Sequence, residues 1–157
     1  MDIFLVRRSA LYNASDDVAE SAHFLSVEGR QWVRAVSSRV KQDEAPELSA
    51  ILTSPSAACV QTAELFADRV DYLGAITVLP GLAGDVPAKV LGAQISARAA
   101  HVAVVADEPA LSALGAFLIG RPSFPLSLPG QVCLLRDHQP ECYWRPDAMV
   151  RAPLLVA

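Results

Sequence analysis

Charged side chains that can bind or repel an anion follow two apolar runs of the chain. Arg7 and Arg8 come directly after the first run, and Asp107 and Glu108 come just after the run at 102–105. A guanidinium presents several N–H donors that match the oxygens of a phosphate or a carboxylate. Two adjacent arginines are usually a solvated pair, and acidic residues before a proline favour the start of a helix. Because both pairs directly follow apolar runs, a pocket is the alternative interpretation.

The other side chains that could supply a nucleophile or a metal ligand form no recognisable set. Cys59 is expected in the first turn of a helix, where a thiolate is stabilised, but a Cys-x5-Arg phosphatase motif would need arginine where Leu65 stands. His23, His101 and His138 are scattered, although the segment that holds His23 can reach over a pocket. No pair of cysteines or histidines has metal-ligand spacing, so we expect neither a metal nor a cofactor.

Short apolar runs alternate with helical patterns along the whole chain. The runs predict strands at 3–6, 50–53, 75–79, 102–105, 132–135 and 142–144. Helices are predicted at 27–41, 54–70, 86–99 and 108–118. This alternation is typical of an α/β fold, a three-layer α/β/α sandwich with a mostly parallel sheet. Ligands bind beyond the carboxyl ends of parallel strands, so the segments to consider are 7–9, 54–59, 81–85 and 106–108.

Local signals refine three of these elements. Ser54 followed by Pro55 predicts the N-cap and first residue of the second helix, so Ser54 is expected to be a cap and not a catalytic hydroxyl. In the fourth helix, Phe117 is expected to pack in the core beside the leucines around it. The segment 121–130 holds three prolines and is expected to be a surface connection.

Length and composition limit the class of protein. With 157 residues, 52% of them hydrophobic, we expect one domain spanning 1–157 and exclude a disordered chain. The net charge of −4 makes nucleic acid and an anionic membrane poor partners. No segment approaches the ~20 apolar residues of a membrane span, and the N-terminus lacks the form of a signal peptide. Three cysteines, an odd number, indicate free thiols in a reducing compartment, so a cytoplasmic location is expected.

Four short motifs resemble those of the histidine phosphatase (phosphoglycerate mutase-like) superfamily, in particular its SixA-type phosphohistidine phosphatases. The family's strand with Arg-His-Gly is similar to FLVRRS at 4–9, and its Leu-Thr-x-x-Gly-x-x-Gln helix entry to LSVEGRQ at 25–31. Its Ser-Ser-Pro-x-x-Arg-x-x-Gln-Thr-Ala block is similar to TSPSAACVQTA at 53–63 in all but the arginine, and its Val-Gly-His-x-Pro to VADEP at 105–109. The resemblance covers nearly the whole chain and implies the phosphoglycerate mutase-like fold.

The same resemblance implies that most of the catalytic side chains are replaced. In the family, one histidine attacks phosphorus, while a second histidine and two arginines hold the phosphoryl oxygens. The motifs place Arg7 at the first arginine, Arg8 at the nucleophile, Ala58 at the second arginine and Asp107 at the second histidine. A guanidinium has no acceptor lone pair at any usable pH, so Arg8 cannot form a phospho-enzyme. Loss of the nucleophile alone can cost about 10⁶ in turnover.

Asp107 and Ala58 also weaken the binding of a phosphate. A carboxylate ~4 Å from a phosphate oxygen costs ~4 kcal/mol per unit charge at an effective dielectric of ~20, or about three decades of affinity. Ala58 lacks the bidentate donor of the arginine that it replaces. If the fold is kept, Arg8 and Asp107 face each other across the pocket floor. We therefore predict an Arg8–Asp107 ion pair in the place of the phosphate, which Arg7 can join.

These observations favour a catalytically inactive phosphohistidine phosphatase-like protein, a pseudophosphatase. It would bind a signalling protein partner or an altered ligand in a pocket formed by Arg7, Arg8, Ser9, Asp107 and Glu108. Two alternatives stay open. The first is an active phosphatase, acting on phosphohistidine or another phosphomonoester with a displaced nucleophile. The second is a binder of phosphate or another small anion through Arg7 and Arg8.

Overall fold

The computed structural model describes residues 1–12, 22–98, 100–148 and 150–156. The strands are β1 (Asp2–Arg7), β2 (Ala50–Thr53), β3 (Ile76–Val78), β4 (His101–Ala106), β5 (Val132–Arg136), β6 (Gln139–Trp144) and β7 (Arg151–Pro153). The helices are α1 (Val27–Glu44), α2 (Ala57–Arg69), α3 (Ala88–Ser96) and α4 (Ala110–Ile119), with a short 3₁₀ helix η2 (Pro80–Ala83). The predicted alternation of strands and helices is therefore confirmed as far as α4.

The strands form one sheet in the order β3-β2-β4-β1-β5-β6-β7. Neighbouring strands from β3 to β1 are parallel, whereas β5, β6 and β7 are antiparallel to their neighbours. The expected mostly parallel sheet is thus only half correct. The turn between β5 and β6 accounts for one of the three antiparallel pairings, because Asp137 and His138 both have positive φ, at 50° and 61°, and form a tight reversal. β7 was not predicted, since Arg151-Ala152-Pro153 contains no apolar run.

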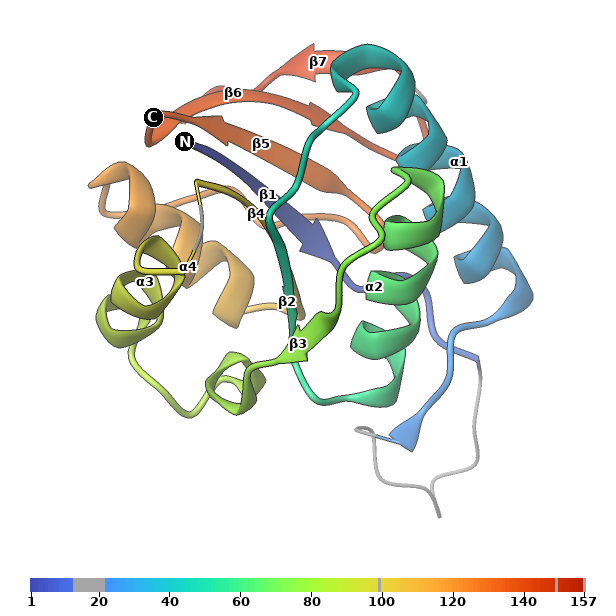
Figure 1. The fold of residues 1–157 in the computed structure, drawn as a ribbon, viewed down its shortest axis with the longest axis horizontal. Helices are drawn as coiled ribbons and strands as arrows, with labels where there is room; N and C mark the ends of the chain where they lie inside the picture. The colour runs from blue at the N-terminus through green and yellow to red at the C-terminus, as the bar shows by residue number, and fades with distance from the viewer. Residues whose placement is uncertain (13–21, 99, 149, 157) are drawn as a thin grey trace.

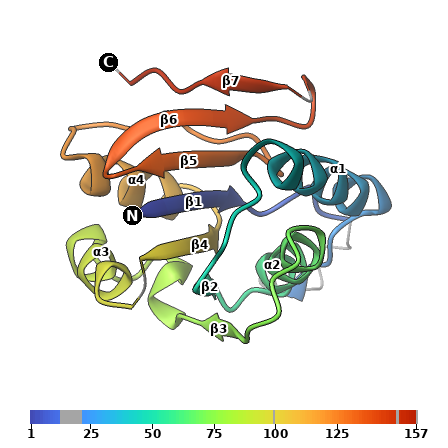
Figure 2. The same cartoon turned by 45° about the horizontal axis from the view of Figure 1, so that its top comes forward.

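The helices cover both faces of the sheet. Figures 1 and 2 show α1 and α2 on one face and α3 and α4 on the other, which confirms the three-layer sandwich. Side chains of β1 alternate between the two layers: Phe4 and Val6 belong to the core beneath α1 and α2, and Ile3 and Leu5 to the core beneath α3 and α4. A central strand with two buried faces explains why 3–6 is apolar throughout.

The start of α2 differs from the prediction. Ser56 is the N-cap, with its hydroxyl accepting the N–H of Cys59 at 3.3 Å, and the helix begins at Ala57. Ser54 is buried, and its N–H donates to the carbonyl of Val105 at 2.9 Å. This bond continues the pairing of β2 with β4 by one residue, so Ser54 belongs to the strand end and not to the helix cap.

The prediction that Phe117 packs in the core is wrong, and the prediction of a surface connection at 121–130 is only partly correct. Phe117 is 44% exposed and not in the core; its ring lies over Gly92 of α3, where a Cβ would collide with it. The segment 121–130 is not merely a surface connection, since Phe124 packs against Gly115 of α4 and Ser127 is only 4% exposed. This loop therefore lies partly inside the protein, and one of its residues contacts the candidate site.

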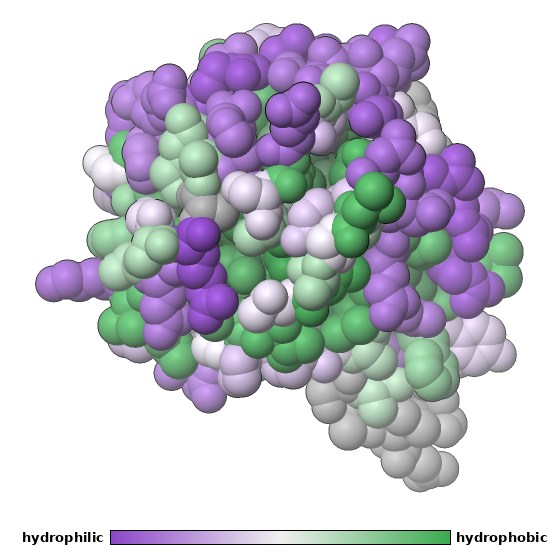
Figure 3. Space-filling view, viewed as in Figure 1, coloured by the Kyte–Doolittle hydropathy of each residue, from purple (hydrophilic) through white to green (hydrophobic). Residues whose placement is uncertain are grey.

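Polar and apolar surfaces are unevenly distributed. Figure 3 shows polar residues gathered over the β6–β7 side of the molecule and apolar surface near the β3 edge. Leu73 is 97% exposed beside that edge, and Val78 is 47% exposed on it. Within the described ranges, every helix is too short or too polar to span a lipid bilayer.

Candidate functional site

Parallel pairing brings the predicted site residues together at the carboxyl ends of β1 and β4. Arg7, the last residue of β1, is paired in register with Ala106, the last residue of β4. The N–H of Arg8 donates to the carbonyl of Ala106 at 3.0 Å, so the chains stay together for one more residue. Arg8 and Asp107, which follow these two strands, are consequently neighbours although they lie 99 residues apart in the sequence.

A cleft of about 500 Å³ opens at these strand ends. Arg8, Asp107 and Glu108 line it, as predicted, and so does Ala58. Residues 82–84, which are part of the segment 81–85 considered from the sequence, also line the cleft. The remaining lining residues are Leu11, Ser54, Pro55, Ser56, Pro109 and Ala110. The walls are therefore largely apolar, and the charged groups come from the ends of β1 and β4.

Three N–H donors converge on the carboxylate of Asp107. Oδ1 accepts from Nε of Arg7 at 2.8 Å and from the backbone N–H of Glu108 at 2.7 Å. Oδ2 accepts from Nε of Arg8 at 2.9 Å. The predicted Arg8–Asp107 ion pair is confirmed, and Arg7 joins it on the other oxygen. We call Arg7, Arg8 and Asp107 the ion triad. Because its arginine side chains are only 15% and 14% exposed, their charges depend on the carboxylate for a partner.

Further hydrogen bonds fix both ends of the ion triad. Nη1 of Arg7 donates to the carbonyl of Ser127 at 2.6 Å, and Nη1 of Arg8 donates to the carbonyl of Ser9 at 3.2 Å. Arg7 does not line the cleft, since it lies behind the carboxylate that it binds. The guanidinium groups thus have their Nε and Nη1 donors committed within the protein.

Glu108 has a structural task beside the cleft. Its Oε1 accepts the N–H of Ser112 in the first turn of α4 at 2.7 Å, as expected of an acidic residue at a helix start. Its Oε2 accepts the N–H of Ser127 at 2.9 Å. Ser127 is therefore held through its N–H by Glu108 and through its carbonyl by Arg7. The sequence carried no signal for this contact, because Ser127 lies in a proline-rich segment far from the motifs.

Ser9 differs from the expectation that it would line the pocket. It is fully buried, its hydroxyl donates to the carbonyl of Gly29 at 2.7 Å, and its N–H donates to the hydroxyl of Thr62 at 3.2 Å. Gly29 approaches the chain after β1 so closely that a Cβ there would collide with the carbonyl oxygen of Ala10. Ser9 and Gly29 together fasten that segment to α1, so Ser9 positions Arg8 and does not face the cleft.

The thiol nearest the cleft is not suited to attack. Cys59 is 0% exposed, and burial raises the pKa of its thiol above the usual value. Since the thiolate is the reactive form, Cys59 stays a neutral, shielded group at physiological pH. This agrees with its interpretation as a small apolar core residue.

No histidine of the described chain lines the cleft. His101 lies at the start of β4, with its Nδ1 3.7 Å from the carboxylate of Asp2. Asp2 is the first residue of β1, so about 16 Å of strand lies between it and the end of β1 at the cleft. His138 contacts the carbonyl of Leu118 at 3.0 Å. His23 is half-buried and is absent from the cleft lining. Within the described residues no cluster of histidine, cysteine and carboxylate groups could hold a metal ion.

Solved structures share this fold over almost the whole chain. The protein histidine phosphatase SixA, solved with tungstate, superposes with a TM-score of 0.83 at 20% identity, over 96% of this chain and 100% of that one. A candidate phosphohistidine phosphatase SixA from Agrobacterium tumefaciens matches with a TM-score of 0.75 at 17% identity, over 92% and 98% of the two chains. The α-ribazole phosphatase from Shigella flexneri matches with a TM-score of 0.63 at 15% identity, over 88% and 93%.

The similarity is one of structure and not of sequence. No protein-family model matches the chain, and no curated protein matches it either. The expected phosphoglycerate mutase-like architecture is nevertheless confirmed by the solved structures.

Proposed function

We propose that this chain, which has the fold of the SixA phosphohistidine phosphatases, has lost phosphatase activity and acts by binding a protein partner through its cleft. One observation carries the proposal: the carboxylate of Asp107 accepts the N–H donors of Arg7, Arg8 and the Glu108 backbone. Donors of this kind hold the oxygens of a phosphoryl group in proteins. The protein therefore supplies its own anion to the donors that a phosphate would need.

The chemistry of the lining residues supports the loss of activity. Hydrolysis through a phospho-enzyme needs a nucleophile with an available lone pair beside phosphorus. Arg8 has none, and Cys59 is buried and protonated. The described residues around the cleft include no histidine. Of the other groups in the cleft that could attack phosphorus, the hydroxyls of Ser54 and Ser56 have no described histidine beside them to act as a base. The carboxylates of Asp107 and Glu108 already accept N–H donors, so the contacts of the cleft disfavour an active enzyme with a displaced nucleophile.

The charge of the cleft argues against a simple binder of phosphate. Its lining holds one cation, Arg8, and two carboxylates, Asp107 and Glu108. The second cation, Arg7, is covered by the carboxylate that it binds. A phosphate dianion would meet Asp107 at close range, at a cost of several kcal/mol. A protein partner in a signalling pathway fits the site better, and the three buried free cysteines agree with a cytoplasmic setting.

A phosphatase assay tests the proposal. The purified protein is incubated with a phosphohistidine peptide and with p-nitrophenyl phosphate, beside the Arg8→Ala variant. We expect phosphate release at the rate of buffer alone for both proteins. Turnover that is well above this rate and is lost in Arg8→Ala would overturn the proposal.

A triple variant tests whether the cleft is the place of the family's phosphate site. Arg8→His, Ala58→Arg and Asp107→His together replace the three side chains that differ from the family motif. We expect inorganic phosphate to bind this variant measurably more tightly than the parent protein. An unchanged affinity would count against the placement of the site at this cleft.

A further inference from the structure

Among the described residues, the carboxylate of Asp107 has donors for all but one of its acceptor positions. A carboxylate offers about four acceptor positions. Oδ1 of Asp107 uses two, for Arg7 and the Glu108 N–H, and Oδ2 uses one, for Arg8. No other described residue donates to Oδ2, and the side chain is 38% exposed where it lines the cleft. The position on Oδ2 that no described residue uses can therefore accept an N–H or O–H donor that enters the cleft.

The remainder of the cleft favours a flat group without negative charge. The guanidinium groups of Arg7 and Arg8 balance the carboxylates of Asp107 and Glu108, so the charged side chains at the cleft sum to zero and favour an uncharged ligand group. Leu11, Leu82 and Ala58 contribute apolar surface. A volume of about 500 Å³ leaves ample room for a single aromatic ring and its backbone.

We propose that the cleft binds the unphosphorylated histidine side chain of a partner protein, with a ring N–H donated to Oδ2 of Asp107. The inference rests on the proposed function. In a phosphohistidine, a ring nitrogen is bonded to phosphorus, and the phosphoryl oxygens need N–H donors. Here the carboxylate with its three donors takes the role of the phosphoryl group. The hydrogen bond from the ring nitrogen to Oδ2 takes the role of the N–P bond.

The same geometry excludes the phosphorylated form of that histidine. A phosphoryl group on the ring would be forced against the carboxylate of Asp107, with like charges in contact. A lysine would place an ammonium group beside the Arg8 guanidinium, which repels it. Glutamine lacks the ring that the apolar walls can cover. The site therefore distinguishes a dephosphorylated histidine from its phosphorylated state.

A peptide-binding experiment at pH 8, where free imidazole is neutral, tests this inference. The probes are a seven-residue peptide with one central histidine, its phosphohistidine form, and the versions with glutamine or lysine in place of histidine. Binding is followed by the shift of the Asp107 and Glu108 backbone amide resonances. We expect the histidine peptide to bind at least tenfold more tightly than each of the other three.

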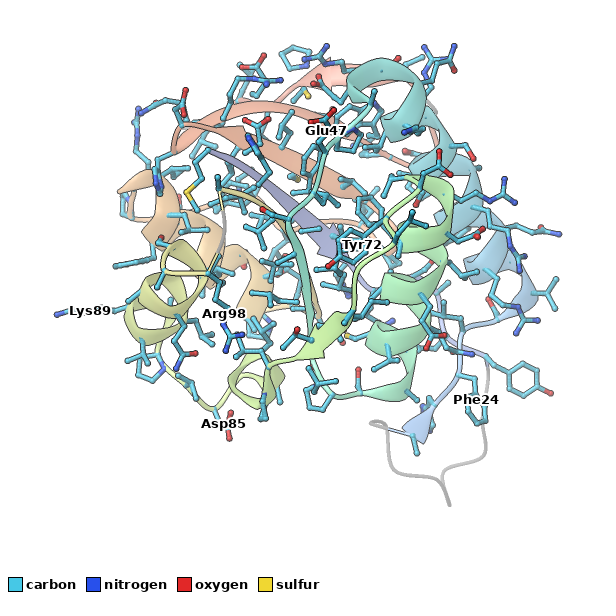
Figure 4. The ribbon with its side chains drawn as sticks, in the orientation of Figure 1. Phe24, Glu47, Tyr72, Asp85, Lys89 and Arg98 are labelled. Atoms are coloured by element: carbon cyan, nitrogen blue, oxygen red, sulfur yellow. The ribbon has the colours of Figure 1, made fainter. Side chains whose placement is uncertain are left out.

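A variant of the acceptor completes the test. Because hydrogen bonds to charged groups are strong, Asp107→Ala should weaken binding of the histidine peptide about 10- to 100-fold and strengthen that of the phosphohistidine peptide. Glu47→Ala, labelled in Figure 4, removes one negative charge from an exposed residue that does not line the cleft, and it should change neither. If Asp107→Ala does not fold, Asp107→Asn, which keeps the shape, serves instead.

The outcomes separate this inference from the proposed function. Equal or tighter binding of the phosphohistidine, glutamine or lysine peptide to the parent protein would overturn the inference. So would the absence of any resonance shift with the histidine peptide. Neither result would count against the proposed loss of phosphatase activity, which is measured independently by phosphate release. Hydrolysis of the phosphohistidine peptide would instead overturn the proposed function.

Discussion

Removing the Asp107 carboxylate should convert the cleft into a phosphate site. Asp107 lies 2.8 and 2.9 Å from the Nε atoms of Arg7 and Arg8, so a phosphate bound by those atoms would lie within ~4 Å of the carboxylate. At an effective dielectric of ~20, the repulsion is ~4 kcal/mol per phosphate charge. The carboxylate is 38% exposed, and water screens it, so we halve this figure to ~2 kcal/mol. Asp107→Ala should then bind a phosphate monoanion ~30-fold, and a dianion ~1,000-fold, more tightly.

Isothermal titration with inorganic phosphate at fixed ionic strength measures this change. The variant leaves two partly buried guanidinium groups without their carboxylate, so its Tm should fall and then rise as phosphate is added. Glu47→Ala is the control, since it makes the same change in net charge at an exposed residue that does not line the cleft. Equal phosphate affinities for Asp107→Ala and Glu47→Ala would refute the predicted repulsion.

Three further predictions concern the scaffold around the site. Gly29→Ala should lower the free energy of unfolding by at least ~2 kcal/mol, because its Cβ collides with the backbone of Ala10; a urea midpoint unchanged from the parent would contradict this. Glu108→Ala leaves two backbone N–H groups, one of them on Ser127, without their acceptor, and should cost ~1–3 kcal/mol in the same assay, whereas a neutral effect would show that water replaces the carboxylate. Burial raises the pKa of Cys133 to about 11 from 9.0, so the unfolded chain loses this proton first and stability should fall between these pH values, by ~2 kcal/mol at pH 10.5; a Cys133→Ala variant that loses as much stability over this range would exclude the thiol as the cause.

The sequence predicted the central part of the fold well because its signals there are strong. The run at 3–6 is apolar at every position, and both of its faces are buried in β1. The helix predicted at 27–41 is α1, and Val33, Val36 and Val40 on its apolar stripe are buried. In contrast, β7 could not be found, since its three residues gain their strand geometry from pairing with β6 and not from their own pattern.

The candidate site was predictable where it depends on neighbouring strand ends. Arg8 and Asp107 both follow buried strands, and the resemblance of their motifs to those of the histidine phosphatases placed them opposite each other. The roles of Ser9 and Ser127 were not predictable. Ser9 bonds to α1 and α2, and Ser127 reaches Arg7 from a loop 120 residues away. Such contacts depend on how loops pack in three dimensions, which spacing in the sequence does not record.

Diffraction from crystals soaked in tungstate is the most direct test of the claim that Asp107 occupies the anion site. Tungsten scatters strongly, and tungstate is the ion with which the structurally similar SixA was solved. The soak uses a concentration that saturates crystals of Asp107→Ala. We expect no tungsten beside Arg8 in the parent protein, with Asp107 still bound to both arginines. Tungstate bound there in the parent, with the Asp107 side chain turned away, would contradict the account.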